Sequence, residues 1–230
     1  MDLVFENWGL IDYELALRNQ ESLVELVHTQ QKPPTVIFCQ HPPLVTKGRA
    51  TQAEDITDWS GPIYEINRGG RATYHGPSQL MIYPIIPIDI SSHTRKASDV
   101  GAFLRQFELA LVDVLMEFGI SAQGKSSKSH DPANSPPSVT MAAHLNPKTQ
   151  TETGVWIGNK KIASLGLSIR HWVTFHGAAL NIEIDPQAFQ GIKPCGFSPS
   201  IMTNMEEQLK YIPNRDHIIN SLKKTLQDRL

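Results

Sequence analysis

A glycine-rich segment at residues 68–79, RGGRATYHGPSQ, constrains this chain most, and it lies between apolar runs at 63–66 and 80–85. The paired glycines and the later Gly-Pro permit sharp turns and a close approach of backbone to a ligand. The same segment carries arginine, threonine, histidine and glutamine side chains, which offer several hydrogen-bond donors and acceptors. A connecting loop with incidental polar residues is the alternative. We favour a substrate-binding loop held between two strands.

The composition is that of an ordinary globular protein. The chain has 230 residues, of which 40% are hydrophobic and 19% charged, enough to bury a core. Its net charge of −2 argues against a nucleic-acid binder. We expect no membrane segment and no signal peptide, because no apolar run is long enough and the first residues lack a basic start. Two cysteines in unlike contexts favour free thiols and a cytoplasmic location.

The order of predicted elements is mixed. Helical spacing of apolar residues predicts helices over about 12–30, 100–118 and 214–230, the first ended by Pro33 and Pro34. Asp185 and Pro186 predict a short helix through Phe189. Besides the runs that flank 68–79, β-branched and aromatic runs predict strands at 35–39, 155–157, 161–163, 167–169, 172–175 and 180–184. This order favours one α+β domain over residues 1–230, with helices packed on a largely antiparallel or mixed sheet.

Residues 121–153 shift in composition to serine, proline, lysine, asparagine and glutamine. We interpret them as a surface insertion and expect it to be mobile. His130, Asp131 and His144 lie inside it, but their spacing is too irregular for a metal site. We therefore expect neither a metal nor a cofactor.

The two cysteines differ in their surroundings. Cys39 ends an apolar run and is expected in the core, whereas Cys195 lies in a Pro-Cys-Gly loop. Such a tripeptide alone is weak evidence of catalysis. A thiol attacks as the thiolate, and at a reference pKa of about 8.5 only a small part of it is ionised at neutral pH. A catalytic Cys195 therefore needs a helper.

Histidine and lysine are the candidate helpers. His75 and His176 could act as bases, and Lys161 could supply a charge. An ammonium about 4 Å from the sulfur interacts by roughly 4 kcal/mol at an effective dielectric constant of about 20. Lowering a thiol pKa by about two units needs only about 2.7 kcal/mol. Both kinds of helper remain open on the residues alone.

Four separated motifs resemble, in the same order, those of the lipoyl(octanoyl) transferases. They are the segment at 68–79, GVWIGNKKIASLG at 154–166, FHGAALN at 175–181 and PCG at 194–196. Gln40-His41-Pro42-Pro43 with Gly48-Arg49 also resembles that family. Four motifs in order are far more specific than any one of them.

The resemblance implies a fold shared with biotin and lipoate protein ligases. It implies that Cys195 is the acyl-accepting nucleophile, and that Lys161 lowers the thiol pKa and relays protons. It also implies a substrate pocket lined by the following residues: Arg68, Gly69, Gly70, Arg71, Ala72, Thr73, Tyr74, His75, Ser164, Leu165, Gly166, Gly177, Ala178 and Ala179.

The implied reaction belongs to lipoate biosynthesis. Octanoyl-acyl carrier protein would be the donor, and an acyl-cysteine thioester the intermediate. The acceptors would be lipoyl domains of 2-oxoacid dehydrogenase complexes and the glycine cleavage H protein. Because carrier proteins are acidic, the candidate docking cations are Lys47, Arg49, Arg71, Lys160 and Arg170. The alternatives are an ATP-dependent lipoate or biotin ligase, octanoyl transfer between lipoyl domains, and a binding module without catalysis.

Three departures from the family pattern stand out. Ser78 replaces a usual glycine, and it is strained if that position needs a positive φ. Gln40 replaces a usual glutamate before His-Pro. The insertion at 121–153 is longer than expected.

Overall fold

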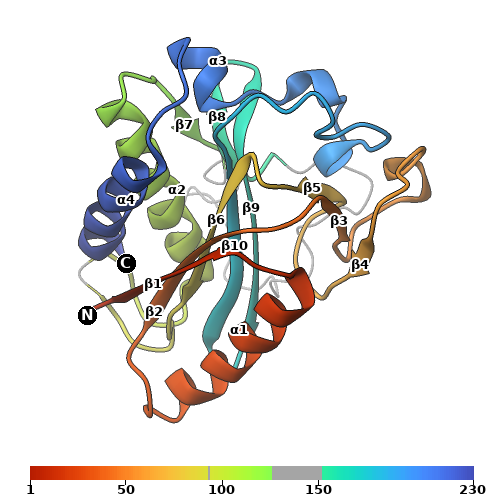
Figure 1. Ribbon diagram of the computed structural model, residues 1–230. Helices are drawn as coiled ribbons and strands as arrows, with labels where there is room; N and C mark the ends of the chain where they lie inside the picture. Colours follow the sequence, from red (N-terminus) through yellow and green to blue (C-terminus); the bar gives the residue numbers. More distant parts are fainter. Residues whose placement is uncertain (93, 126–151) are drawn as a thin grey trace, which may run out of the picture.

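The computed structural model describes residues 1–92, 94–125 and 152–230 (Figure 1). The helices are α1 (Tyr13–His28), α2 (Val100–Glu117), α3 (Met205–Leu209) and α4 (Arg215–Arg229). The strands are β1 (Val4–Leu10), β2 (Thr35–Gln40), β3 (Leu44–Lys47), β4 (Ile63–Glu65), β5 (Thr73–His75), β6 (Gln79–Ile85), β7 (Gln123–Gly124), β8 (Gly154–Ile157), β9 (Lys160–Arg170) and β10 (Val173–Asn181). Within these ranges no helix has both the length and the apolar character needed to cross a bilayer.

The described strands form two sheets. The larger has the order β1-β2-β6-β10-β9-β8-β7, and its neighbours are antiparallel except for the parallel pair β1 and β2. The smaller has the order β4-β3-β5, with β3 parallel to β4 and antiparallel to β5. The expected α+β fold with a largely antiparallel, mixed sheet is confirmed.

The larger sheet buries both of its faces, because successive side chains of a strand point to opposite sides. On one face, α2 and α4 pack against the strands in the main core, to which Phe103, Phe107 and Leu222 contribute. On the other face, α1 packs against side chains that include Met81 and Phe175 (Figure 1). The small sheet lies beside this layered unit in Figure 1 and has its own apolar cluster around Val45 and Tyr74.

The three long predicted helices are confirmed, and each begins at a side-chain cap. Asp12, Asp99 and Asn214 accept hydrogen bonds from backbone N–H groups in the first turns of α1, α2 and α4. The predicted end of α1 at about residue 30 lies two residues beyond the observed one. The helix ends at His28, where the N–H of Thr29 donates to the carbonyl of Glu25.

Other elements differ from the sequence prediction. Segment 68–79 is not one loop, since β5 lies inside it and pairs with β3. The predicted strand pairs 161–163 with 167–169, and 172–175 with 180–184, belong to the single strands β9 and β10. The predicted helix at 186–189 is a series of turns, because Phe189 takes a left-handed φ of 65°. Neither β1 nor α3 was predicted, and most of the insertion, with His130, Asp131 and His144, lies outside the described residues.

Candidate active site

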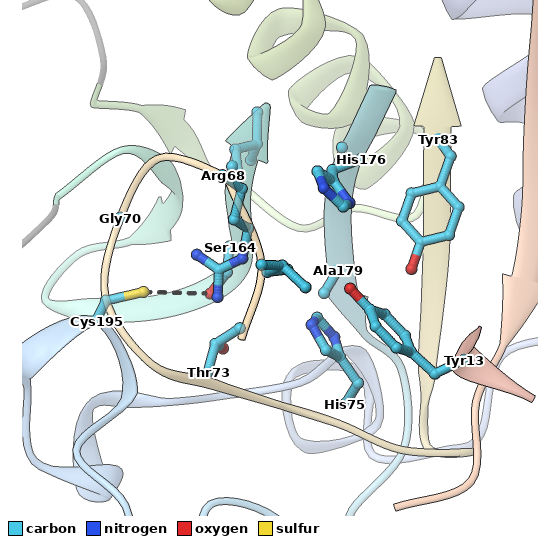
Figure 2. A pocket seen from close by; sticks show the side chains of 15 residues that line it. Tyr13, Arg68, Gly70, Thr73, His75, Tyr83, Ser164, His176, Ala179 and Cys195 are labelled. Carbon is cyan, nitrogen blue, oxygen red and sulfur yellow. Dashed lines mark hydrogen bonds between the residues drawn. The ribbon is translucent and has the colours of Figure 1, made fainter. Parts of the chain in front are cut away.

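Cys195 lies in a tight turn at the edge of a cavity. The turn covers Pro194–Gly196, and Cys195 has a left-handed backbone with φ 55° and ψ 21°. This conformation costs a side-chain-bearing residue roughly 1–2 kcal/mol. The N–H of Cys195 donates to the carbonyl of Ala72 at 2.8 Å, and its Sγ lies 4.0 Å from Oγ of Ser164 (Figure 2). Cys39, by contrast, is buried in the core as predicted, and burial raises the pKa of its thiol.

A β-bulge places Lys161. Gly154 pairs with Ser164 and Val155 with Ala163, but Trp156 pairs with Lys161, so Ile162 is an extra residue in β9. Without the bulge, side chains three positions apart would point to opposite faces. With it, Lys161 shares the face of Trp156 and Ser164.

Space for the Lys161 side chain depends on Gly154. Lys161 is fully buried. Gly154 has a φ of 142°, and a Cβ added there would lie 2.7 Å from Cε of Lys161 and 2.3 Å from the carbonyl oxygen of Ala163. A larger residue at position 154 would therefore displace the lysine.

Trp156 is the common neighbour of the two expected catalytic residues. Cys195 belongs to the small buried cluster formed with Trp156 and Phe197. Nζ of Lys161 lies 5.4 Å from the centre of the indole, and Nζ of Lys125 lies 3.8 Å from it. Cations favour aromatic faces at such distances. The structure thus brings Lys161 and Cys195, 34 positions apart in sequence, to one side chain.

The cavity beside Cys195 has a volume of about 490 Å³, counted to its open mouth. Its lining residues come from α1, the 66–75 segment, β6, β9, β10 and the Cys195 turn (Figure 2). They are Tyr13, Ile66, Arg68, Gly70, Thr73, His75, Tyr83, Ser164, Leu165, Gly166, His176, Gly177, Ala178, Ala179 and Cys195.

Ten of the fourteen expected pocket residues line this cavity, and four do not. Ala72 and Tyr74 point into the apolar cluster of the small sheet, because they alternate with Thr73 and His75 along β5. Gly69 lines an adjoining groove. Arg71 lies behind the Cys195 turn, paired with Asp55. A continuous range drawn from motifs does not take this alternation into account.

Tyr13, Ile66 and Tyr83 line the cavity but were not among the expected residues. Tyr13 was predicted as part of the apolar face of a helix, and Tyr83 as part of an apolar strand, so neither stood out. The hydroxyl of Tyr83 lies 2.8 Å from Nε2 of His41. Tyr13 Oη, Thr73 Oγ1 and His75 Nδ1 are buried without a hydrogen-bond partner among the described residues. Burial raises the pKa of Tyr13, so its hydroxyl stays protonated.

Neither candidate helper histidine carries a charge. Burial and the neighbouring charge of Arg68 lower the pKa of His176 to about 3. Burial, with His41 and Arg68 nearby, lowers the pKa of His75 well below its usual value. Both rings are therefore neutral at physiological pH, and the fixed positive charges near the cavity belong to lysine and arginine.

Arg68 is a buried cation held by neutral oxygens. Its guanidinium donates to the carbonyl of Gly69 at 2.8 Å, to Oγ1 of Thr46 at 2.9 Å and to the carbonyl of Arg71 at 3.0 Å. Burial lowers its pKa and the charge of Cys195 opposes that change, but an arginine remains protonated. No carboxylate among the described residues forms an ion pair with it. Its charge is thus available to an anion in the cavity.

The cavity adjoins a larger groove of about 1700 Å³, including its solvent-open part, lined by apolar and polar side chains. Five residues line both spaces: Ile66, Gly70, Leu165, Gly166 and His176. Apolar side chains of the groove include Leu104, Leu167 and Phe175. Among the residues described, no three histidine, cysteine or carboxylate side chains are grouped to hold a metal ion.

Comparison with known proteins identifies the family. Residues 12–227 match the model of the lipoyl protein ligase A/B catalytic domain. An octanoyltransferase of Bdellovibrio bacteriovorus is 46% identical over 207 residues, covering 90% of this chain and 89% of the relative. An octanoyltransferase of Pelobacter propionicus is 32% identical, with 89% and 84% covered. The chain belongs to the octanoyltransferase family.

The fold of this octanoyltransferase family member extends to ligases. The solved bipartite lipoate protein ligase of Thermoplasma acidophilum superposes with a TM-score of 0.65 at 18% identity, covering 100% of this chain and 84% of that chain. At that identity the likeness establishes the fold alone. It confirms the expected ligase-like fold.

Two departures from the octanoyltransferase pattern have a structural explanation. The backbone of Ser78 does not take a positive φ, so serine is not strained there, and its hydroxyl donates to Asp185 at 3.2 Å. The side-chain amide of Gln40 donates to the carbonyl of Pro77 at 2.7 Å, a bond that an ionised glutamate could not make. Both residues secure the Gly-Pro turn.

Proposed function

We propose that this protein transfers an octanoyl group from octanoyl-acyl carrier protein to a lysine of lipoyl domains, through a thioester on Cys195. Its membership of the octanoyltransferase family supports the octanoyl group and the lipoyl-domain acceptor. The observation that carries the residue assignment is the meeting of Cys195 and a fully buried Lys161 at Trp156. The free thiols fit a reducing, cytoplasmic compartment.

In the first half-reaction, the Cys195 thiolate attacks the carbonyl carbon of the donor thioester. A new carbon–sulfur bond forms, the bond to the carrier sulfur breaks, and the carrier leaves as its thiol after taking a proton from Lys161. The buried ammonium of Lys161, which shares Trp156 as a neighbour with Cys195, would favour the thiolate that starts the step. The guanidinium of Arg68 in the cavity stabilises negative charge that develops on the carbonyl oxygen.

In the second half-reaction, the amine of the acceptor lysine attacks the acyl-Cys195 thioester. Lys161, now neutral, takes the proton that this amine loses, and the Cys195 thiolate leaves. The product is an amide, which is more stable than a thioester. The reaction is therefore downhill and needs no ATP.

Backbone donors beside the nucleophile are already engaged. The N–H of Cys195 donates to Ala72, and the N–H of Gly196 donates to the carbonyl of Lys193 at 2.9 Å. Ser164 lies within a strand that pairs on both sides. This favours a side chain, Arg68, as the main donor to the oxyanion.

The groove is suited to the octanoyl chain. It adjoins the cavity at Leu165, and its apolar side chains include Leu104 and Leu167. Each buried methylene contributes about 0.8 kcal/mol, so a chain of this length gains several kcal/mol. The groove can thus select acyl chains by length.

Among the expected docking cations, Arg49 remains available. Lys47 pairs with Glu65 at 2.6 Å and Arg170 with Glu21 at 3.0 Å, while Arg71 is buried with Asp55. Lys160 donates to the carbonyl of Ser200. Arg49 is exposed at the groove, and its one described side-chain bond goes to Asn67 at 3.4 Å. We propose that Arg49 contacts the acidic surface of the carrier protein.

Intact-mass spectrometry tests the function. Mixed with octanoyl-acyl carrier protein without ATP, the protein should gain one octanoyl group, and Cys195→Ala should not. Added lipoyl domain should then receive that group. Strict dependence on ATP would indicate a ligase, and no acyl product would indicate a binding module. Acylation only by octanoylated lipoyl domain would indicate transfer between lipoyl domains.

A further inference from the structure

An ion pair lies buried behind the Cys195 turn. Asp55 is fully buried, and Arg71 is 5% exposed. Nε of Arg71 donates to Oδ2 of Asp55 at 2.8 Å, and Nη2 donates to Oδ1 in a second bond. Such two-point pairing fixes the guanidinium in one plane. Glu54, which is exposed, lies 3.7 Å from the same guanidinium.

This pair touches the Cys195 turn from both ends. The N–H of Lys193 donates to the backbone carbonyl of Asp55 at 2.7 Å. Gly196 lies against the guanidinium, since a Cβ added there would lie 2.6 Å from Nη1 of Arg71. Gly196 also has a φ of 85°, so any other residue would be both strained and in collision. Lys193, on one side of Cys195, is thus held by Asp55, and Gly196, on the other side, lies against Arg71.

The pair also contributes charge at the nucleophile. The hydrogen bonds that Arg71 donates to Asp55 raise the pKa of Arg71, and the charge of Cys195 acts in the same direction. The other charged groups around the turn include Lys193, which directly precedes it, Lys161 and Arg68, with Glu54 at the outer edge. Asp55 therefore balances Arg71, and together they leave the thiol beside a nearly neutral pair.

We propose that the Arg71–Asp55 ion pair is a positioning device that holds Cys195 in its left-handed conformation, facing the cavity. The inference rests on the proposed role of Cys195 as nucleophile. Arg71 and Asp55 are positioning residues, because they act through the turn and lie outside the cavity. The neighbouring bond from Cys195 N–H to Ala72 completes the support.

Removing one partner and removing both have different consequences. A single substitution leaves an unpaired buried charge, whereas replacing both partners by neutral residues does not. Arg71→Gln leaves the Asp55 carboxylate near the sulfur, which disfavours the thiolate. Asp55→Asn leaves Arg71 with only the exposed and more distant Glu54 as a counter-charge, which favours the thiolate. The two single variants should therefore move the reactivity of Cys195 in opposite directions along the pH axis.

The experiment follows Cys195 with iodoacetamide and with octanoyl-acyl carrier protein. Alkylation rates are measured from pH 5 to 10 for the full chain, for Arg71→Gln, for Asp55→Asn and for the double variant. Rapid-mix intact-mass spectrometry gives the rate of Cys195 acylation for the same four proteins. Thermal melts report stability. The double variant Asp113→Asn/Arg229→Gln, which removes an ion pair between α2 and α4, is the matched control.

We expect the half-maximal pH of alkylation to rise in Arg71→Gln and to fall in Asp55→Asn. The double variant should keep the parent midpoint but acylate at least tenfold more slowly, because the turn is no longer held. The control should lose thermal stability only. Equal midpoints and acylation rates in all variants, with changed melting temperatures alone, would overturn the proposal. A parent protein that is not acylated at all would count against the proposed function. Alkylation needs no acyl donor, so the pH midpoints of alkylation would still test the role of the ion pair.

Discussion

Lys161 lies directly opposite Trp156 across the β8–β9 pair, with its ammonium 5.4 Å from the centre of the indole. This placement depends on the single extra residue in β9, Ile162, which lies in the main core on the other face. A buried lysine is rare unless its charge is used or compensated. Its position next to the Cys195 cluster is consistent with the proposed role of Lys161 as charge partner and proton carrier for the sulfur.

Removing the ammonium of Lys161 should slow catalysis strongly without unfolding the protein. Lys161→Met lacks the ammonium but keeps an unbranched apolar side chain only one heavy atom shorter, so we expect a folded protein. Loss of a proton-transfer group typically lowers the rate by about 10²- to 10⁴-fold. Single-turnover transfer from octanoyl-acyl carrier protein measures this. Lys160→Met, a change at the exposed neighbour, should keep the parent rate, and equal loss in both variants would contradict the assignment.

The helices of this fold could be predicted from the sequence because their apolar faces repeat at helical spacing and Asp12, Asp99 and Asn214 mark their starts. The β-bulge could not, because nothing in the run Lys161-Ile162-Ala163 distinguishes a regular strand from one with an extra residue. The motifs pointed to Cys195 and Lys161 as the candidate catalytic pair, which stays a prediction. They could not indicate Asp55, because its ion pair with Arg71, 16 positions later in the sequence, forms only in the folded structure.

The left-handed backbone of Cys195 predicts an unusual order of stability among its variants. Glycine adopts this conformation without penalty, alanine does so at a cost of roughly 1 kcal/mol, and a β-branched residue at a higher cost. We therefore expect Cys195→Gly to melt about 2–4 °C above Cys195→Ala, and Cys195→Val to melt lowest. Scanning calorimetry of the three inactive variants measures the order. The reverse order of glycine and alanine would show that the turn relaxes.

The neutral buried histidines predict loss of stability in acid. The pKa of His176 falls from about 6.5 in the unfolded chain to about 3 in the folded protein, mainly through burial. Between those pH values the unfolded state binds more protons than the folded state does. The contribution of His176 to the free energy of unfolding is therefore complete above pH 6.5 and declines as the pH falls. At pH 5 the loss from this residue alone is about 2 kcal/mol. Denaturant titrations from pH 8 to 4.5 should show this decline.

His176→Asn separates this effect from general acid sensitivity. Asparagine tolerates the left-handed φ of 57° found at this position and does not titrate in this range. The variant should therefore lose less stability between pH 8 and 5 than the parent does. His75 and His41, whose pKa values are also lowered by burial, should keep part of the slope. Identical slopes in parent and variant would contradict the assignment.

Arg49 should affect recognition of the carrier protein and not the chemistry at Cys195. It is exposed at the outer part of the groove and lacks a carboxylate partner among the described residues, so it can meet an acidic protein surface. Reversing its charge in Arg49→Glu should raise KM for octanoyl-acyl carrier protein about 5- to 10-fold, on the order of 1 kcal/mol, with kcat retained. The increase should shrink at high salt, because salt screens exposed charges. Lys224→Glu, an equal change of charge on the exposed side of α4, is the control and should leave KM unchanged. A small octanoyl thioester without the carrier should be used equally well by the parent and by Arg49→Glu, and a loss with that substrate would place Arg49 in the chemical step.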